Sequence, residues 1–135
     1  MNTCASLFVD FLNAKDLSFG TRELGDESLV TFPYHGRNTI VVFGGDNGDH
    51  AQLITTVEAV PDDRYVDAVL ACNQLNCTYR YVKFAVDKDN DVVVRADAIL
   101  DESSAGEEAF ELLVRNCQII DEARPVIMKA IYGAN

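Results

Sequence analysis

Hydrophobic and polar positions alternate along this chain with two different periods. Apolar residues recur every three to four positions over residues 3–15, which predicts an amphipathic helix that Thr3 can cap. A polar, glycine-containing stretch at residues 18–28 then ends the helix and leads into a sheet. Segments rich in β-branched and aromatic residues follow, separated by turn residues, and we expect them to form strands. These strands lie at residues 29–34, 39–43 and 52–60.

The helical period returns after residue 60. Pro61 and the two acids after it suit the first turn of a second helix. We expect the core-facing stripe of this helix to consist of Val66, Val69, Leu70, Asn73 and Cys77. The last helix begins at a capping box formed by Ser104 and Glu107, and Pro125 should kink or divide it.

Between these two helices, alternation with period two predicts a β-hairpin with strands at residues 80–87 and 92–100. Its core face would carry Val82, Phe84, Val86, Val92, Val94 and Ala96. On the opposite face we expect Ala85 and Val93, with Tyr81 across from Asp97 and Lys83 across from Arg95. Like charges that face each other across a strand pair are destabilising unless an acid lies between them. We therefore predict a partner-binding surface that consists of Tyr79, Tyr81, Lys83 and Arg95. The alternative is an ordinary solvated sheet face on which Tyr81 is half exposed.

The predicted elements follow the order α-β-β-β-α-β-β-α and indicate an α+β fold. We expect residues 1–135 to form one domain, in which an antiparallel five-stranded sheet carries its helices on one face. The run from Ile40 to Phe43 is apolar on both faces of its strand, so one layer of helices cannot cover all of it. Apolar sheet surface should therefore remain for another chain.

Charge limits the classes of partner. The chain has 22 acidic and 11 basic residues and a formal net charge of −11, which argues against binding to nucleic acid or to an anionic membrane. Its first residues do not resemble a signal peptide, and no apolar run has the ~20 residues of a membrane span, so we expect a cytoplasmic protein. In a reducing compartment Cys4, Cys72, Cys77 and Cys117 should be buried, reduced core residues.

No motif predicts a reaction, a metal site or a cofactor. Asp87, Asp89 and Asp91 share part of the spacing of a calcium loop, but that loop also needs a glycine and a glutamate that are absent here. His35 and His50 lie in turns without further clustered ligands. Asn73 and Asn76 fit a structural role, in which they hydrogen-bond the end of the second helix to the hairpin. We therefore predict a protein that is not an enzyme.

The sequence NQLNCTYRYVKF at residues 73–84, followed by DVVVRAD at residues 91–97, resembles the central part of the YbjN family. The helix around Ala123-Arg124-Pro125 and Ile127-Met128 is similar as well, and the likeness extends over residues 62–132. This resemblance implies a fold like that of type III secretion chaperones, a cytosolic location, dimerisation and a role in regulation. It implies no catalytic residues.

Two kinds of function are compatible with these patterns. The first is a chaperone-like binding or regulatory protein, a homodimer that holds a protein or peptide partner on an apolar sheet surface. The alternative is a small-ligand binder or an enzyme with a pocket near the loops at residues 35–38 and 44–50.

Overall fold

Three α-helices and six β-strands make up the regular structure in the computed structural model, which describes residues 1–133. In chain order they are α1 (Thr3–Ala14), β1 (Gly20–Leu24), β2 (Glu27–Tyr34), β3 (Arg37–Gly44), β4 (His50–Ala59), α2 (Tyr65–Thr78), β5 (Lys83–Val86), β6 (Asp91–Ile99) and α3 (Ala105–Tyr132). Single 3₁₀ turns at Asp62–Arg64 and Glu102–Ser104 precede α2 and α3.

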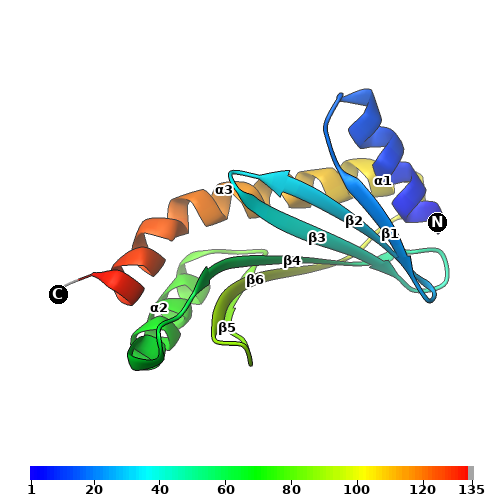
Figure 1. Cartoon of the computed structure of the whole chain (residues 1–135). Helices are drawn as coiled ribbons and strands as arrows, with labels where there is room; N and C mark the ends of the chain where they lie inside the picture. The colour runs from blue at the N-terminus through cyan, green and yellow to red at the C-terminus, as the bar shows by residue number, and fades with distance from the viewer. Residues whose placement is uncertain (134–135) are drawn as a thin grey trace.

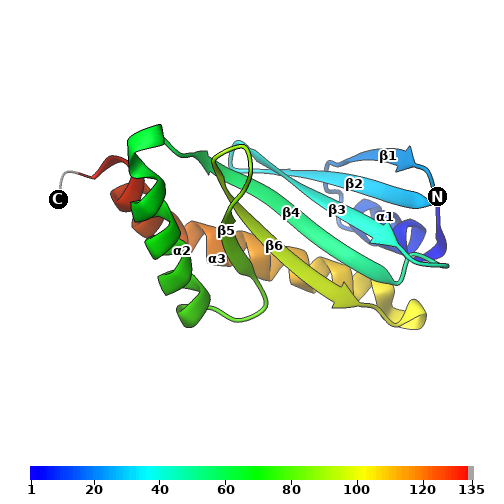
Figure 2. The ribbon, with the colours of Figure 1, turned by 90° about the horizontal axis from the view of Figure 1, so that it is seen from below.

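The six strands form one antiparallel sheet with the order β1-β2-β3-β4-β6-β5. The helices α1 and α3 lie on one face of this sheet, and α2 packs at its far end against β5 and α3 (Figure 1). Seen from below, the strands pass in front of α1 and α3 (Figure 2). The predicted α+β fold with an antiparallel sheet and helices on one face is thus confirmed, but the sheet has six strands and not five.

The additional strand is β1, which lies in the stretch that we expected to be an irregular connection. All five of its residues are exposed, so it has no alternation of apolar and polar residues that would reveal a strand. Gly25 and Asp26 form the two-residue turn that pairs β1 with β2, and Gly25 has a φ of 59°. A glycine with a positive φ is typical of a two-residue hairpin turn. Gly25 is therefore the residue from which the hairpin of β1 and β2 could have been predicted.

Two clusters of buried apolar side chains fill the space between the sheet and the helices. One joins α1 to β2, β3 and the first half of α3, and the other joins α2 to β5, β6 and the second half of α3. Buried polar residues lie where the clusters meet: the hydroxyl oxygens of Thr39 and Thr55 are 2.7 Å apart, and Asn116 Nδ2 donates to Thr55 Oγ1 at 3.1 Å. Because α3 contributes to both clusters, it connects the two halves of the core.

The prediction of which side of α2 faces the core is wrong. Val66 and Leu70 are 67% and 62% exposed, and Asn73 and Cys77 are exposed as well. The buried side of α2 instead carries Ala68, Ala71, Cys72 and Leu75. Three of these four side chains are small, which allows α2 to pack closely against β5 and α3.

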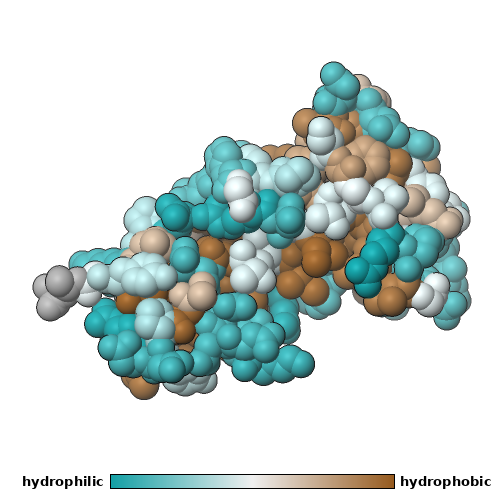
Figure 3. Space-filling view, viewed as in Figure 1, coloured by the Kyte–Doolittle hydropathy of each residue, from teal (hydrophilic) through white to brown (hydrophobic). Residues whose placement is uncertain are grey.

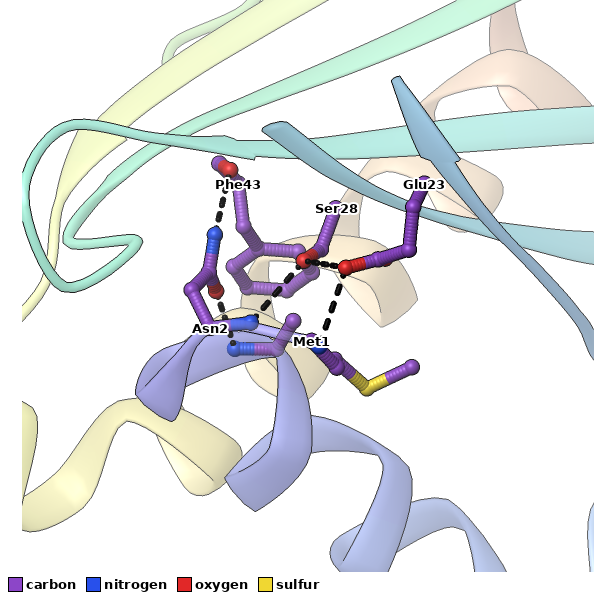
Figure 4. A network of polar contacts seen from close by, with 6 residues as sticks. Met1, Asn2, Glu23, Ser28 and Phe43 are labelled. Atoms are coloured by element: carbon purple, nitrogen blue, oxygen red, sulfur yellow. Dashed lines mark hydrogen bonds and ion pairs between the residues drawn. The ribbon is translucent and has the colours of Figure 1, made fainter. Parts of the chain in front are cut away.

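The helix ends also differ from the expectation. Asn2, not Thr3, caps α1, because its Oδ1 accepts from the N–H of Ala5 at 3.1 Å. The backbone N–H of Asn2 donates to Ser28 Oγ, its Nδ2 donates to the carbonyl of Phe43, and the amino group of Met1 pairs with Glu23 (Figure 4). This network ties the start of α1 to three strands.

At the start of α3, Asp101 and Glu108 replace the predicted capping box of Ser104 and Glu107. Asp101 Oδ1 accepts from the N–H of Ser103, and Glu108 Oε1 accepts from the N–H of Asp101. Pro125 does not divide α3, which continues to Tyr132. Since Pro125 is on the exposed side, water can reach the carbonyl that its missing N–H leaves free.

Candidate partner-binding site

The sheet face that points away from α1 and α3 carries apolar side chains at its centre. Leu29 on β2, Ile40 and Val42 on β3, and Ile54 on β4 alternate with residues of the buried core, and we call these four residues the open face. Ile40 is 36% exposed, and the other three are partly buried. Apolar surface is visible along the middle of the molecule between polar regions in Figure 3. No helix of the described residues covers these side chains.

A pair of basic residues lies beside the open face. In the register of β5 and β6, Lys83 is directly opposite Arg95, as predicted. Arg95 is also opposite Ile54 on β4, so the basic pair continues the row of Ile40 and Ile54 across the sheet. Both basic residues are exposed, and within residues 1–133 neither forms an ion pair.

The two tyrosines of the predicted surface lie elsewhere. Tyr79 packs at the edge of the second core cluster, with its ring 6.2 Å from that of Phe84, and burial raises its pKa. The strand β5 begins only at Lys83, so Tyr81 is not opposite Asp97. Tyr81 is 62% exposed, has a φ of 74°, and faces the guanidinium of Arg115 on α3 at 5.4 Å. The structure therefore brings together Lys83 and Arg95 but neither tyrosine.

Val93 also departs from the expected alternation. It is 2% exposed although its neighbours Val92 and Val94 face the core. Its partner on β4 is Thr56, and a β-bulge follows between Thr56 and Glu58. A bulge bends the strand and increases the local twist of the strand pair.

The outer edge of β5 is closed by α2. Asn76 Oδ1 accepts from the N–H of Phe84 at 2.7 Å, and Asn76 Nδ2 donates to the carbonyl of Phe84 at 3.0 Å. The side-chain amide thereby takes the place that a neighbouring strand would have. Asn73, the second asparagine that we expected to link helix and hairpin, is exposed on α2. At the other edge of the sheet, β1 pairs only with β2.

The outward side of α2 is a second apolar surface. Tyr65, Val66, Val69 and Leu70 are all exposed there, and we call them the α2 stripe. Beside it, a groove of about 700 Å³ runs between α2 and the end of α3. Arg64 lines the groove, and its guanidinium donates to the carbonyls of Ala130 and Gly133 and pairs with Asp67 at 3.3 Å. The guanidinium of Arg64 is thus already bound within the chain, whereas Lys129, which also lines the groove, forms no ion pair within residues 1–133.

The loops at residues 35–38 and 44–50, near which we expected the alternative pocket, do not share one pocket. These turns lie at opposite ends of β3, a strand of eight residues, so roughly 25 Å separates them. His35 Nδ1 is 3.4 Å from Asp121 on α3, and the hydroxyl of Tyr34 donates to the same carboxylate at 2.9 Å. His50 lines a separate shallow hollow of about 420 Å³ with Gln52, Asp97 and Ile99.

Titratable groups show no cluster of the kind that binds a metal. Among residues 1–133, no three His, Cys, Asp or Glu side chains come close enough together to hold an ion. Asp87 Oδ1 instead accepts from the N–H groups of Asp89 and Asp91 in the hairpin turn. Burial, reinforced by Asp121, raises the pKa of the Cys117 thiol to about 11, and burial also raises the pKa of Cys4 and Cys72.

None of the described helices is both long enough and apolar enough to cross a membrane. The model of the YbjN family, described as "Putative bacterial sensory transduction regulator", matches residues 7–123. Among curated proteins, none is significantly similar to this chain in sequence.

Two solved structures that contain a chain similar to this one are type III secretion complexes. The Yersinia pestis type III secretion chaperone SycH in complex with a stable fragment of YscM2 contains a chain with 14% identity and a TM-score of 0.57, and the match covers 91% of this chain and 98% of that one. A chain of the ExoU-SpcU complex of Pseudomonas aeruginosa has 13% identity and a TM-score of 0.46, with 96% and 98% covered. The first match shows that the two chains share a fold.

Proposed function

This chain belongs to the YbjN family, whose model matches residues 7–123, and we propose that it is a non-enzymatic regulatory protein of the cytoplasm. In this proposal the protein holds an extended segment of a protein partner against the open face of its sheet. The observation that carries the proposal is the uncovered apolar row of Leu29, Ile40, Val42 and Ile54.

Physical chemistry favours this use of the sheet. An antiparallel sheet commonly exposes one face to water, and that face then carries polar residues. Here four apolar side chains from three neighbouring strands lie together on the exposed face. A contiguous apolar patch of this kind is typical of an interaction surface. The likeness to SycH, which was solved with a fragment of YscM2, supports a peptide-like partner.

We also propose that the protein is a homodimer and that its α2 stripe forms the interface. The stripe exposes four large apolar or aromatic residues within six positions of one helix. Two copies related by a two-fold axis would cover each other's stripe, because such an interface uses the same surface on both subunits. This leaves the open face of each copy free for a partner.

Affinity capture from the native host tests the binding proposal. Replacing Ile40→Thr and Ile54→Thr together keeps β-branched residues in the strands but removes apolar surface from the open face. We expect about tenfold less partner to be captured than by the wild type, since each substitution replaces a methyl group with a hydroxyl and removes one methylene group, whose burial is worth about 0.8 kcal/mol. The control is Val114→Thr on α3, because Val114 is 36% exposed, as Ile40 is. Equal capture by the double variant and the wild type would show that the open face is not the binding surface.

A further inference from the structure

We infer that the partner segment carries a carboxylate that binds between Lys83 and Arg95, after two apolar side chains that lie over Ile40 and Ile54. This inference rests on the proposed use of the open face and names the chemistry of the partner. The partner would be an extended peptide segment with an apolar residue at one position, a second apolar residue two positions later, and Asp or Glu two positions after that.

Charge is the first reason. Two like charges directly opposite each other on neighbouring strands destabilise the pair. Within residues 1–133 no acid lies within ion-pairing distance of either Lys83 or Arg95, although acidic residues outnumber basic ones two to one along the chain. Asp97, the next residue on the same side of β6, accepts a hydrogen bond from Gln52 instead, at 3.0 Å. A carboxylate from outside would relieve the repulsion between Lys83 and Arg95 and accept hydrogen bonds from both.

Register is the second reason. Ile40, Ile54, Arg95 and Lys83 are successive partners across β3, β4, β6 and β5, so they form one row perpendicular to the strands. With neighbouring strands about 4.8 Å apart, Arg95 is about 10 Å and Lys83 about 14 Å from Ile40 along this row. An extended peptide advances about 6.6 Å every two residues, and the side chains at these alternate positions face the same way. A peptide residue over Ile40 therefore places the residue four positions later about 13 Å away, between Arg95 and Lys83.

The closed edge of β5 is the third reason. A partner strand cannot add beside Phe84, because Asn76 already bonds both backbone groups of that residue. At this end of the sheet the partner can therefore reach Lys83 only from the open face. A segment that crosses the strands meets the apolar row and the basic pair in the order described above.

Fluorescence anisotropy with synthetic peptides tests the inference. The probe is a labelled peptide, Ser-Leu-Thr-Ile-Ser-Asp-Ser, and its control replaces Asp with the isosteric Asn. We expect the Asp peptide to bind the wild-type protein about tenfold more tightly, because charge-assisted hydrogen bonds are about twice as strong as neutral ones. The double variant with Lys83→Gln and Arg95→Gln should bind both peptides with equal affinity. Arg22→Gln, which removes a positive charge on β1 at a distance from the pair, should keep the preference.

Several outcomes would overturn the inference. These are equal binding of the two peptides by the wild type, the same preference in the Lys83→Gln and Arg95→Gln double variant, and no binding of the Asp peptide at millimolar concentration. Failure of this inference can be distinguished from failure of the proposed function. If Ile40→Thr with Ile54→Thr reduces capture of host proteins while the carboxylate has no effect, the open face binds a partner and only its acidic chemistry is wrong.

Discussion

Burial separates the four cysteines into two chemical classes. Cys4, Cys72 and Cys117 are buried, and the raised pKa of each keeps its thiol protonated at neutral pH. Cys77 is exposed on α2, contrary to the expectation that all four would be buried. We expect a thiol reagent at pH 7 to modify one cysteine in each folded, dilute chain, because only an accessible thiolate reacts. The measurement is absorbance with Ellman's reagent, followed by mass spectrometry of the modified peptide.

Cys77→Ser is the matched control for this prediction. The variant should show no rapid labelling when folded and three modified thiols in denaturant. Fast modification of Cys117 in the folded protein would contradict the packing of α3, because that side chain is only 6% exposed.

At the scale of elements, one side-chain amide holds α2 to the hairpin. Asn76→Ala removes both hydrogen bonds to the backbone of Phe84 and leaves the N–H and C=O of that residue without these partners. We expect the free energy of unfolding to fall by about 1–3 kcal/mol, the usual cost of unpaired groups that are partly buried. Urea denaturation followed by circular dichroism measures the change.

Asn73→Ala is the control for Asn76→Ala, since Asn73 lies one turn earlier on the exposed side of α2. It should change the free energy of unfolding by less than about 0.5 kcal/mol. If the two alanine variants are equally stable, Asn76 does not hold α2 to β5.

Period-two alternation predicts strands well where one face is buried and the other is not. The core side of the hairpin and the pairing of Lys83 with Arg95 follow from it, and both agree with the structure. It cannot detect β1, because all the side chains of that strand are exposed. Within the candidate site, the sequence therefore predicted the basic pair, but it did not show which sheet face the helices leave open.

The helix α2 shows why hydrophobicity alone can choose the wrong side. One side carries large residues such as Val66 and Leu70, and the other carries Ala68, Ala71 and Cys72. A sum of hydrophobicity favours the large residues as the core, and this was our expectation. Close packing against a neighbouring helix instead selects small residues, and the larger ones remain outside. Packing within the chain therefore does not explain why the exposed α2 stripe is apolar.

At the scale of the whole molecule, the open face and the α2 stripe are different surfaces with different geometries. The open face belongs to the middle strands, whereas α2 lies at the end of the sheet next to β5 (Figure 2). A chain with a net charge of −11 repels its own copies at long range, so self-association requires a local apolar contact. In the proposed dimer, the α2 stripe would supply such a contact without covering the sheet.

The last prediction follows from this separation. Val66→Asp with Leu70→Asp places two charges in the stripe of each copy, where pairing would bury them next to the acids of the other copy. We expect the wild type to have twice the 14.9 kDa mass of one chain by light scattering, and the double variant to have the mass of a monomer with an unchanged circular dichroism spectrum. Leu24→Asp is the control, because Leu24 is 52% exposed on β1, in another part of the fold. Binding of the Asp peptide should persist in the monomeric variant, since the open face remains intact. A wild-type monomer at high concentration, or a dimer that survives both substitutions, would show that α2 is not the interface.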